Sequence, residues 1–408
     1  MYISRHLESQ ILEASSHYPV VMVGGQRQVG KSTMLNHIKE PNRRYVSLDD
    51  GNARRLALDD PALFFETYPA PLLINEFQRV PSILLEMKKI VDQMALAGRD
   101  NNGMFWLTGS QKFRMMRDVS ESLAGRIAIF ELSSLSSAEI EGRSANLFRP
   151  DLSLLRERLK TAKKKTVQDI YAQIFCGGMP KLCTTDLDRD RFYIDYINTY
   201  LDRDIHDLAQ VGKLREFNDF LVYMAARTSQ SIQYSEIAKA IGVSQPTAKS
   251  WVSLLESSGI LYILRPYFSN VSKRLVKTPK AYFMDTGLAA YLCRWPDAAT
   301  LEHGAMDGAF LETYVVSEIV KSYWNAGKSA DFYYYRDIDQ KEIDLLFVEG
   351  DTLTPVEIKK SKEPVHPDKN FTVLDKLEKR VQPAVILCLS DEMLPYQRNT
   401  WYFPIRGV

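Results

Sequence analysis

The chain has 408 residues, of which 45% are hydrophobic and 25% charged, and its formal net charge is +1. This length favours two or three domains of ordinary globular composition. The balanced charge excludes a chain that is strongly basic throughout, and no apolar run approaches the roughly 20 residues of a membrane span. The N-terminus lacks a signal-peptide core and the four cysteines show no paired spacing, so we expect a cytoplasmic protein with reduced, mostly buried thiols.

The first motif is the stretch VVMVGGQRQVGKSTML near the N-terminus. An apolar run over 20–23 predicts a buried parallel strand, and a helical pattern follows the motif. Gly25, Gly30, Lys31 and Ser32 have the spacing G-x-x-x-x-G-K-S, in which glycines turn backbone N–H groups toward phosphates. The lysine reaches the β- and γ-phosphates, and the serine hydroxyl ligates Mg²⁺. We predict that ATP and Mg²⁺ bind here, through Gly25, Gln26, Arg27, Gln28, Val29, Gly30, Lys31, Ser32 and Thr33.

Predicted strands and helices alternate over the first 140 residues. The patterns predict strands over 20–23, 44–48, 71–79, 104–108 and 127–132, and helices over 3–15, over 31–38 and from Asp60-Pro61 onward. A phosphate loop after the first strand of such an alternation implies a parallel, doubly wound sheet of about five strands. The fold class is therefore α/β, with an N-terminal P-loop domain.

The strand PLLINEF ends in Asn75 and Glu76, where a P-loop ATPase usually carries an acidic pair. The first acid of such a pair holds Mg²⁺ and the second activates the attacking water. Glu76 can serve as the second, whereas Asn75 offers a neutral oxygen and no charge. We therefore predict a slow Mg²⁺-dependent ATPase, the alternative being that the two residues only end a strand.

Two further candidates follow. The strand FWLT leads into Ser110 and Gln111, either of which is a candidate sensor of the γ-phosphate. Arg126 is a candidate for stabilising transition-state charge, either in cis or from a neighbouring subunit of a homo-oligomer. The alternative for Arg126 is an exposed arginine without a catalytic role.

The middle of the chain is predicted to be helical from about residue 134 to 207. The lysine run 163–165 is interpreted as a solvated helix face, and CGGMP at 176–180 as a turn. Arg203 and Asp204 are interpreted as an ion pair.

Residues 234–258 predict a helix-turn-helix, with a turn at Gly242-Val243 and a wing strand over 260–266. Its second helix would present Gln245, Thr247, Lys249 and Ser250 to DNA. Four cationic residues just beyond it could add charge: Lys273, Arg274, Lys277 and Lys280. Because the second helix itself has one cation, a structural or protein-facing role is the alternative.

The strands over 342–348 and 354–359 carry a second group of reactive residues. A hairpin closed by Val348 and Leu353 would place Asp344 opposite Glu357, with Lys359 nearby. Two carboxylates and a lysine are what a metal-dependent phosphodiesterase needs, and Glu312 or Glu318 on the preceding helix would be a further acid. We predict a metal site at Glu312, Asp344 and Glu357. Binding without cleavage, and a structural ion-pair cluster, are the alternatives.

These segments together carry a family resemblance. GGQRQVGKST, LLINEFQRVP, FWLTGSQ, SLAGR, FCGGMP, TYLDRDI, KTPK and YFMDTGL resemble a widespread bacterial and archaeal group of predicted AAA+ ATPases with a C-terminal domain of unknown function. The resemblance runs from about residue 2 to 362. That C-terminal domain resembles the PD-(D/E)XK nucleases in its D-x(n)-E-x-K pattern. The group usually has Asp-Glu where this chain has Asn75 and Glu76.

The expected domains are a P-loop AAA+ or RecA-like ATPase domain over 1–140, a helical segment over 141–210, a winged helix-turn-helix over 211–270 and an α/β nuclease-like domain over 271–408. One hypothesis is an ATP-dependent switch that acts on DNA through the winged helix and the nuclease-like domain. The other is a nucleotide-gated scaffold that holds a protein partner, with little hydrolysis or cleavage. Neither involves a membrane.

Overall fold

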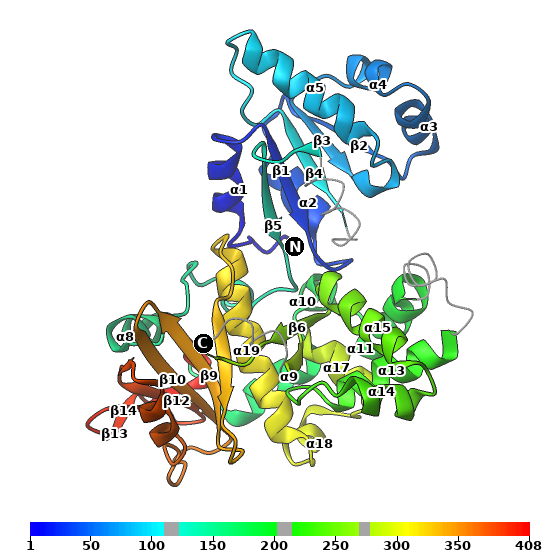
Figure 1. Cartoon of the computed structure of the whole chain (residues 1–408). Helices are drawn as coiled ribbons and strands as arrows, with labels where there is room; N and C mark the ends of the chain where they lie inside the picture. The colour runs from blue at the N-terminus through cyan, green and yellow to red at the C-terminus, as the bar shows by residue number, and fades with distance from the viewer. Residues whose placement is uncertain (110–121, 202–213, 269–277) are drawn as a thin grey trace. The chain divides into compact units, whose positions relative to one another are not determined.

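The computed structural model describes residues 1–109, 122–201, 214–268 and 278–408 (Figure 1). Several predicted residues lie outside these ranges: Ser110, Gln111, Arg203, Asp204, Lys273, Arg274 and Lys277. Two compact units are formed. The first comprises Met1–Leu135, Ser257–Gly259 and Trp324–Lys328, and the second comprises Ser136–Glu256, Ile260–Tyr323 and Ser329–Val408. No helix in the described ranges is both long and apolar enough to cross a membrane.

The first unit contains a five-stranded parallel sheet, as predicted. Its strands are β1 (Val20–Gly24), β2 (Arg44–Ser47), β3 (Leu72–Asn75), β4 (Phe105–Thr108) and β5 (Ile127–Glu131). Their order is β2-β3-β4-β1-β5, so β4 lies between the strand before the phosphate loop and the strand that ends in Asn75. The carboxyl ends of β1 and β3 therefore lie at the same edge of the sheet, which brings the two motifs together.

Helices cover this sheet and bury its apolar side chains. They are α1 (Glu8–Ser15), α2 (Lys31–Ile38), α3 (Gly51–Asp59), α4 (Pro61–Thr67) and α5 (Ile83–Leu96), with a 3₁₀ turn η1 (Phe77–Arg79) after β3. The core joins residues of β1, β3 and β4 to one face of α5, for example Met87 and Val91. The helix α3 was not predicted; Asp50 caps it by accepting from the N–H groups of Asn52 and Ala53. The first predicted helix began five residues before α1.

The second unit begins with helices. They are α7 (Ser137–Ile140), α8 (Leu152–Thr161), α9 (Val167–Cys176), α10 (Pro180–Thr184), α11 (Arg189–Tyr196), a π-helical turn η2 (Ile197–Leu201), α13 (Leu214–Ala226), α14 (Tyr234–Ile241) and α15 (Gln245–Ser257). The lysine run 163–165 lies between α8 and α9, so the interpretation as a helix face was wrong. The turn predicted at 176–180 is present, with Gly177 ending α9 and Pro180 opening α10.

Two buried motifs hold these helices to α17 (Thr286–Leu292). Asp285 caps α17 and is 1% exposed. Its carboxylate accepts from the hydroxyl of Tyr193 (2.7 Å), the N–H of Leu288 (3.0 Å) and the N–H of Gly178 (2.9 Å). A Cβ on Gly287 would lie 2.4 Å from the carbonyl oxygen of Cys176, so the backbones touch. FCGGMP and YFMDTGL are thus two sides of one packing contact.

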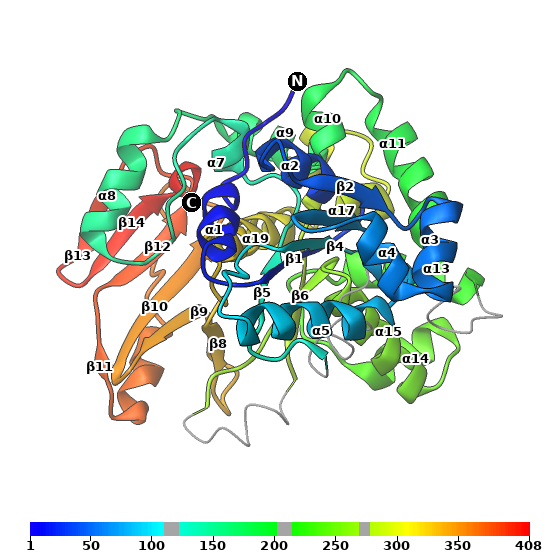
Figure 2. The same ribbon diagram turned by 90° about the horizontal axis from the view of Figure 1, so that it is seen from above.

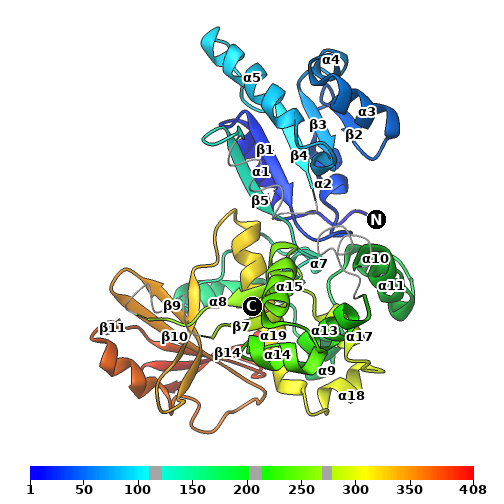
Figure 3. The ribbon, with the colours of Figure 1, turned by 45° about the vertical axis from the view of Figure 1, so that its right-hand side comes forward.

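The helix pair α14 and α15 is joined through Gly242, which has φ 77°, at the predicted turn. After α15, strand β6 (Leu261–Leu264) pairs antiparallel with β7 (Lys280–Phe283). Figure 3 shows α13, α14, α15 and α17 grouped together. Phe217 and Phe220 of α13 pack around Trp251 of α15, with ring centroids 5.1 and 5.4 Å from that of Trp251.

A mixed seven-stranded sheet completes the second unit (Figure 2). Its strands are β8 (Phe332–Arg336), β9 (Glu342–Glu349), β10 (Thr352–Lys359), β11 (Arg380–Val381), β12 (Ala384–Cys388), β13 (Leu394–Gln397) and β14 (Thr400–Pro404). The order is β13-β14-β12-β10-β9-β8, with β11 beside β10, and β10, β12 and β14 are parallel. The long helix α19 (Asp307–Asn325) precedes the sheet in the chain. The shorter elements of this region are α18 (Ala298–Glu302), η3 (Phe371–Leu377) and η4 (Ile405–Gly407).

The four cysteines are all free thiols, as the lack of paired spacing suggested. Their burial is less than expected. Cys388 is buried, Cys183 and Cys293 are half-buried, and Cys176 is exposed.

Candidate nucleotide site and carboxylate cluster

The loop between β1 and α2 has the backbone that a phosphate cradle requires. Gly25 and Gly30 have φ of 133° and 94°, in the region that L side chains rarely adopt. A Cβ on Gly25 would lie 2.0 Å from the carbonyl oxygen of Leu132, so only glycine fits there. Gln28 also has a positive φ, of 60°. Gly30 is the N-cap of α2, whose first residues are Lys31, Ser32 and Thr33, so the helix begins at the loop.

Lys31 is 6% exposed and its ammonium lies over the loop. Its Nζ donates to the carbonyl oxygens of Gly25 (2.8 Å) and Gln26 (2.5 Å). On the other side of the loop, the buried guanidinium of Arg5 donates to the carbonyl oxygens of Val29 and Ser133, both at 2.8 Å. Arg5 was missed because it precedes the motif by 20 positions and belongs to no recognisable pattern.

Ser32 and Asn75 meet at the carboxyl edge of the sheet. The Ser32 hydroxyl donates to Oδ1 of Asn75, which also accepts from the Thr108 hydroxyl (2.8 Å). The Asn75 amide nitrogen donates to the hydroxyl of Ser47 at 3.1 Å. A neutral side chain therefore lies beside the predicted Mg²⁺ ligand, with hydroxyl groups on three sides. Thr108 and Ser47 were missed, although each lies at or next to the end of a predicted strand at this edge.

Glu76 follows directly and has φ 56°, a left-handed backbone that turns its carboxylate out of the strand. Its N–H donates to the hydroxyl of Thr108 at 3.3 Å. Its carboxylate accepts from the side-chain amide of Gln78. The neighbouring strand and the turn after β3 thus both position Glu76.

Arg126 lies away from the loop. It precedes β5, and the register pairs Val20 with Ile127 and Gly24 with Glu131. Arg126 is therefore at the amino end of the sheet, roughly 16 Å of strand from the loop. Its Nε contacts Asp92 Oδ1 at 2.5 Å. The suggested role in cis does not fit this position, and only the role in trans or the non-catalytic alternative is compatible with it.

The β9–β10 hairpin has the predicted register. Leu353 pairs with Val348, and the ladder continues to Val356 with Leu345. Next to that last pair, the Asp344 carboxylate accepts from the N–H of Ile358 at 2.9 Å. On its other side, β9 pairs with β8 with a register shift, a bulge that was not predicted. Bulges of this kind re-aim side chains, and Asp344 lies within it.

Asp344, Glu357 and Lys359 come together as predicted. The Lys359 ammonium lies 2.5 Å from Glu357 Oε2 and 3.6 Å from Asp344 Oδ2. Burial and the Asp344 carboxylate raise the pKa of Glu357 well above its usual value. Burial acts on Asp344 in the same direction, but the Lys359 charge and a hydrogen bond from Glu357 lower its pKa. The Glu357 carboxyl therefore holds its proton more tightly than the Asp344 carboxyl.

A second lysine, Lys280, lies among neighbouring carboxylates. Lys280 is 4% exposed, and its ammonium lies 2.6 Å from Glu342 Oε1 and 3.2 Å from Glu312 Oε1. Glu312 also accepts from the hydroxyl of Tyr282 at 2.7 Å. The suggestion that Lys280 adds to a DNA-facing surface was wrong, because its charge is buried against carboxylates. Burial alone would lower the pKa of Lys280, yet Tyr282 and the nearby carboxylates raise it well above its usual value.

Glu312, Asp344 and Glu357 were predicted to form a metal site. Within the described ranges, no group of three or more His, Cys, Asp or Glu side chains is arranged to hold a metal ion. Glu312 is engaged by Lys280, and Glu318 contacts Lys321 (2.9 Å) and the N–H of Ser137 (2.7 Å) instead. The predicted acids that lie together are thus Asp344 and Glu357, which both contact the Lys359 ammonium.

The raised pKa of Glu357 leads to a stability prediction. As pH rises above the ordinary value of 4.5, the unfolded chain loses this proton while the folded chain keeps it, so folding becomes less favourable. Glu357→Gln should therefore unfold at a higher temperature than the wild type at pH 8, by about 2 °C or more, with the difference vanishing near pH 4. Thermal unfolding from pH 4 to 8 measures this, with the exposed Glu392→Gln as control. A pH-independent difference would contradict it.

The predicted recognition helix α15 presents Gln245, Lys249 and Ser250 to solvent. Thr247 is half-buried, and its hydroxyl lies 2.8 Å from that of Ser244. Lys249 is the one cation among these four predicted positions.

Three regions of the chain match models of known domain families. Residues 17–141 match the model of an AAA domain, 167–299 a domain of unknown function (DUF8612), and 307–408 another domain of unknown function (DUF4143). The uncharacterized proteins Rv2008c of Mycobacterium tuberculosis and Mb2031c of Mycobacterium bovis are each 27% identical over 345 residues, which cover 84% of this chain and 70% of theirs.

Among solved structures, a Walker-type ATPase of Pyrococcus abyssi is similar over 71% of this chain and 96% of its own, with 14% identity and a TM-score of 0.44. The AAA match spans the phosphate loop, Asn75, Glu76 and all five strands of the parallel sheet. The N-terminal part of this chain is therefore similar to AAA domains, and the parts that follow match two domains of unknown function.

Proposed function

We propose that this protein binds ATP with Mg²⁺ at the loop over 25–33, hydrolyses it slowly, and uses the nucleotide state to control DNA contact through its second unit. The observation that carries the proposal is the meeting of Ser32, Asn75 and Glu76 beside the loop. These contacts support the proposal, and Asn75 lacks the charge that an aspartate would supply there.

The residues around the loop fit a nucleotide with its metal. Backbone N–H groups of the loop and the start of α2 would bind the phosphates, and Lys31 would exchange its bonds to loop carbonyls for phosphate oxygens. Mg²⁺ would be held by the hydroxyl of Ser32 and would neutralise phosphate charge. Asn75 would orient that hydroxyl, and Glu76 would accept a proton from the attacking water.

Asn75 limits the rate in this proposal. Asn75→Asp should raise ATP turnover by about tenfold or more, because a carboxylate beside Ser32 strengthens the hold on Mg²⁺. Ser47 and Thr108 can both donate to the new carboxylate, so the change fits without rearrangement. Release of phosphate under saturating ATP and Mg²⁺ measures the rate. Glu76→Gln in the Asn75→Asp background is the control, and it should remove the gain. An unchanged turnover in Asn75→Asp would show that Asn75 does not limit hydrolysis.

The DNA part of the proposal is supported by the Asp344, Glu357 and Lys359 group. Two carboxylates with a lysine can hold a divalent cation and orient water for attack on a phosphodiester. Incubation of supercoiled plasmid with the protein, Mg²⁺ or Mn²⁺, and with or without ATP tests it. We expect metal-dependent nicking that Lys359→Ala abolishes. The absence of both nicking and salt-sensitive DNA binding would exclude the DNA part.

The second candidate is a nucleotide-gated scaffold for a protein partner. It is favoured by the single cation at the presented positions of α15 and by the net charge of +1. This candidate predicts tight ATP binding, no plasmid nicking, and DNA affinity too weak to measure at about 150 mM salt. The plasmid experiment therefore distinguishes the two. In both, the nucleotide site is the same.

A further inference from the structure

A cavity of about 520 Å³ opens in the second unit at the carboxyl ends of three parallel strands. β10, β12 and β14 end in register at Lys359, Cys388 and Pro404, and the segments that follow them line the cavity. The remaining wall is the end of the connection from α8 to α9 together with the start of α9, over 164–170. Crevices outside the carboxyl ends of parallel strands are where open α/β sheets bind ligands. The volume falls in the range of small-molecule sites.

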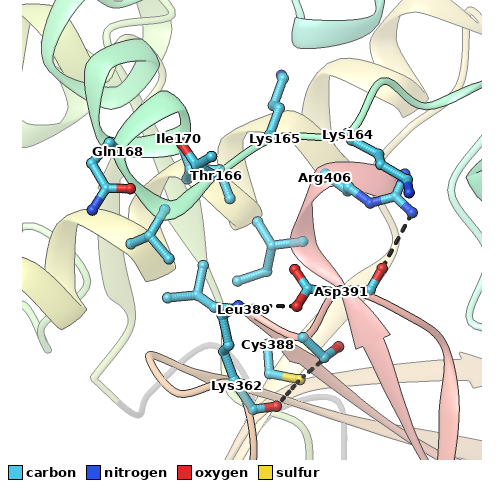
Figure 4. Close-up of a pocket in the computed structure, with 13 residues that line it drawn as sticks. Lys164, Lys165, Thr166, Gln168, Ile170, Lys362, Cys388, Leu389, Asp391 and Arg406 are labelled. Atoms are coloured by element: carbon cyan, nitrogen blue, oxygen red, sulfur yellow. Dashed lines mark hydrogen bonds and ion pairs between the residues drawn. The ribbon is translucent and has the colours of Figure 1, made fainter.

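Cationic side chains dominate the lining. Lys164, Lys165, Lys362 and Arg406 surround the cavity, and Asp391 is the one acid among its lining residues. Figure 4 shows Asp391 between Lys362 and Arg406. The Lys362 ammonium contacts the Asp391 carboxylate at 2.9 Å.

The other three cations differ in how they are compensated. Lys165 forms an ion pair with Glu141, outside the cavity. Arg406 donates instead to the backbone carbonyl oxygens of Ala162 (2.9 Å) and Asp391 (3.3 Å), which carry no net charge. Among the described residues, no acid forms an ion pair with Lys164 or Arg406. The cavity therefore carries excess positive charge.

The neutral groups in the cavity suit an anion as well. Burial raises the pKa of the Cys388 thiol, which therefore stays protonated and adds no negative charge. That thiol lies 3.4 Å from the hydroxyl oxygen of Ser390, which accepts from it and keeps its own proton for a ligand. The first turn of α9 is already capped by Thr166 and Asp169, so the side chains, and not the helix end, supply the recognition.

We propose that this cavity binds a small phosphorylated ligand of up to nucleotide size, with Lys164 and Arg406 holding the phosphate group. The hydroxyl of Ser390 would donate a further hydrogen bond. This site is separate from the loop over 25–33 and does not depend on the DNA-directed proposal, because none of its lining residues belongs to either set.

The experiment uses the full-length chain with Lys31→Ala, which is expected to remove phosphate binding at the loop over 25–33. Titration calorimetry with pyrophosphate and, separately, with AMP should show one saturable site. Lys164→Ala should weaken binding by about tenfold, and Lys164→Ala combined with Arg406→Gln by about a hundredfold. Lys163→Ala is the matched control, since Lys163 is an exposed neighbour that does not line the cavity. Its affinity should equal that of the parent.

Because Lys164 is exposed, its replacement leaves folding intact, which keeps the test decisive even if the Arg406 change disturbs its backbone contacts. Equal affinities for pyrophosphate and AMP would support recognition of the phosphate group alone. A tenfold preference for AMP would support a nucleotide as the source. No saturable binding of either ligand, or equal weakening by Lys163→Ala and Lys164→Ala, would overturn the proposal.

Discussion

Replacing Lys31 with alanine is expected to weaken ATP binding by about 100-fold or more. Charge-assisted hydrogen bonds contribute about 1.5–3 kcal/mol each, and the ammonium can make two of them to the β- and γ-phosphates. The side chain is buried over the loop and already held by the carbonyl oxygens of Gly25 and Gln26, so little ordering is needed when a nucleotide binds. Calorimetric or fluorescence titration with ATP and Mg²⁺ gives the affinity.

The matched control for this prediction is Lys39→Ala at the other end of α2. Lys39 follows the helix and donates to the carbonyl oxygen of Arg43, away from the loop. Lys39→Ala also removes one positive charge, but at the far end of α2, so the affinity for ATP should stay within about twofold. If Lys31→Ala bound ATP as tightly as Lys39→Ala, the loop could not be the phosphate site.

Replacing Asp285 with alanine is expected to destabilise the second unit by about 3–5 kcal/mol. The carboxylate is buried and accepts three hydrogen bonds. Its removal therefore leaves the hydroxyl of Tyr193 and two backbone N–H groups without hydrogen-bond partners. Denaturant unfolding monitored by circular dichroism should show a lower midpoint for the second unit.

Asp297→Ala tests whether this loss comes from burial or from helix capping. Asp297 caps α18 as Asp285 caps α17, accepting from the N–H of Thr300 at 2.7 Å, but it is exposed. Its replacement should cost much less, because water satisfies the freed N–H group. Equal losses in the two variants would refute a special role for the buried contact.

Local patterns in the sequence were sufficient to predict the parallel sheet of the first unit and the loop that follows its first strand. The glycine spacing predicts the loop and the apolar run before it predicts the strand, because each of these features depends on residues that are close in the sequence. The hairpin register also followed from a short loop and alternating side chains. The bulge at Asp344 did not, since it arises from pairing with β8, whose residues lie outside the hairpin.

Residues that act through distant partners could not be predicted. Lys280 is charged and follows a basic stretch, which indicated an exposed position. Its burial depends on Glu312 and Glu342, 32 and 62 positions away, on two other elements. Arg5 likewise depends on Val29 and Ser133. The place of Thr108 beside Asn75 follows from the strand order, which puts β4 between β1 and β3.

The position of Lys280 has a consequence for how the second unit folds. This lysine belongs to the region that matches one domain of unknown function, whereas both of its carboxylate partners belong to the region that matches the next. Separating the two regions would leave a buried ammonium on one fragment and unpaired acids on the other. The two matched regions therefore share one buried group of ion pairs, and we expect them to unfold in a single cooperative step.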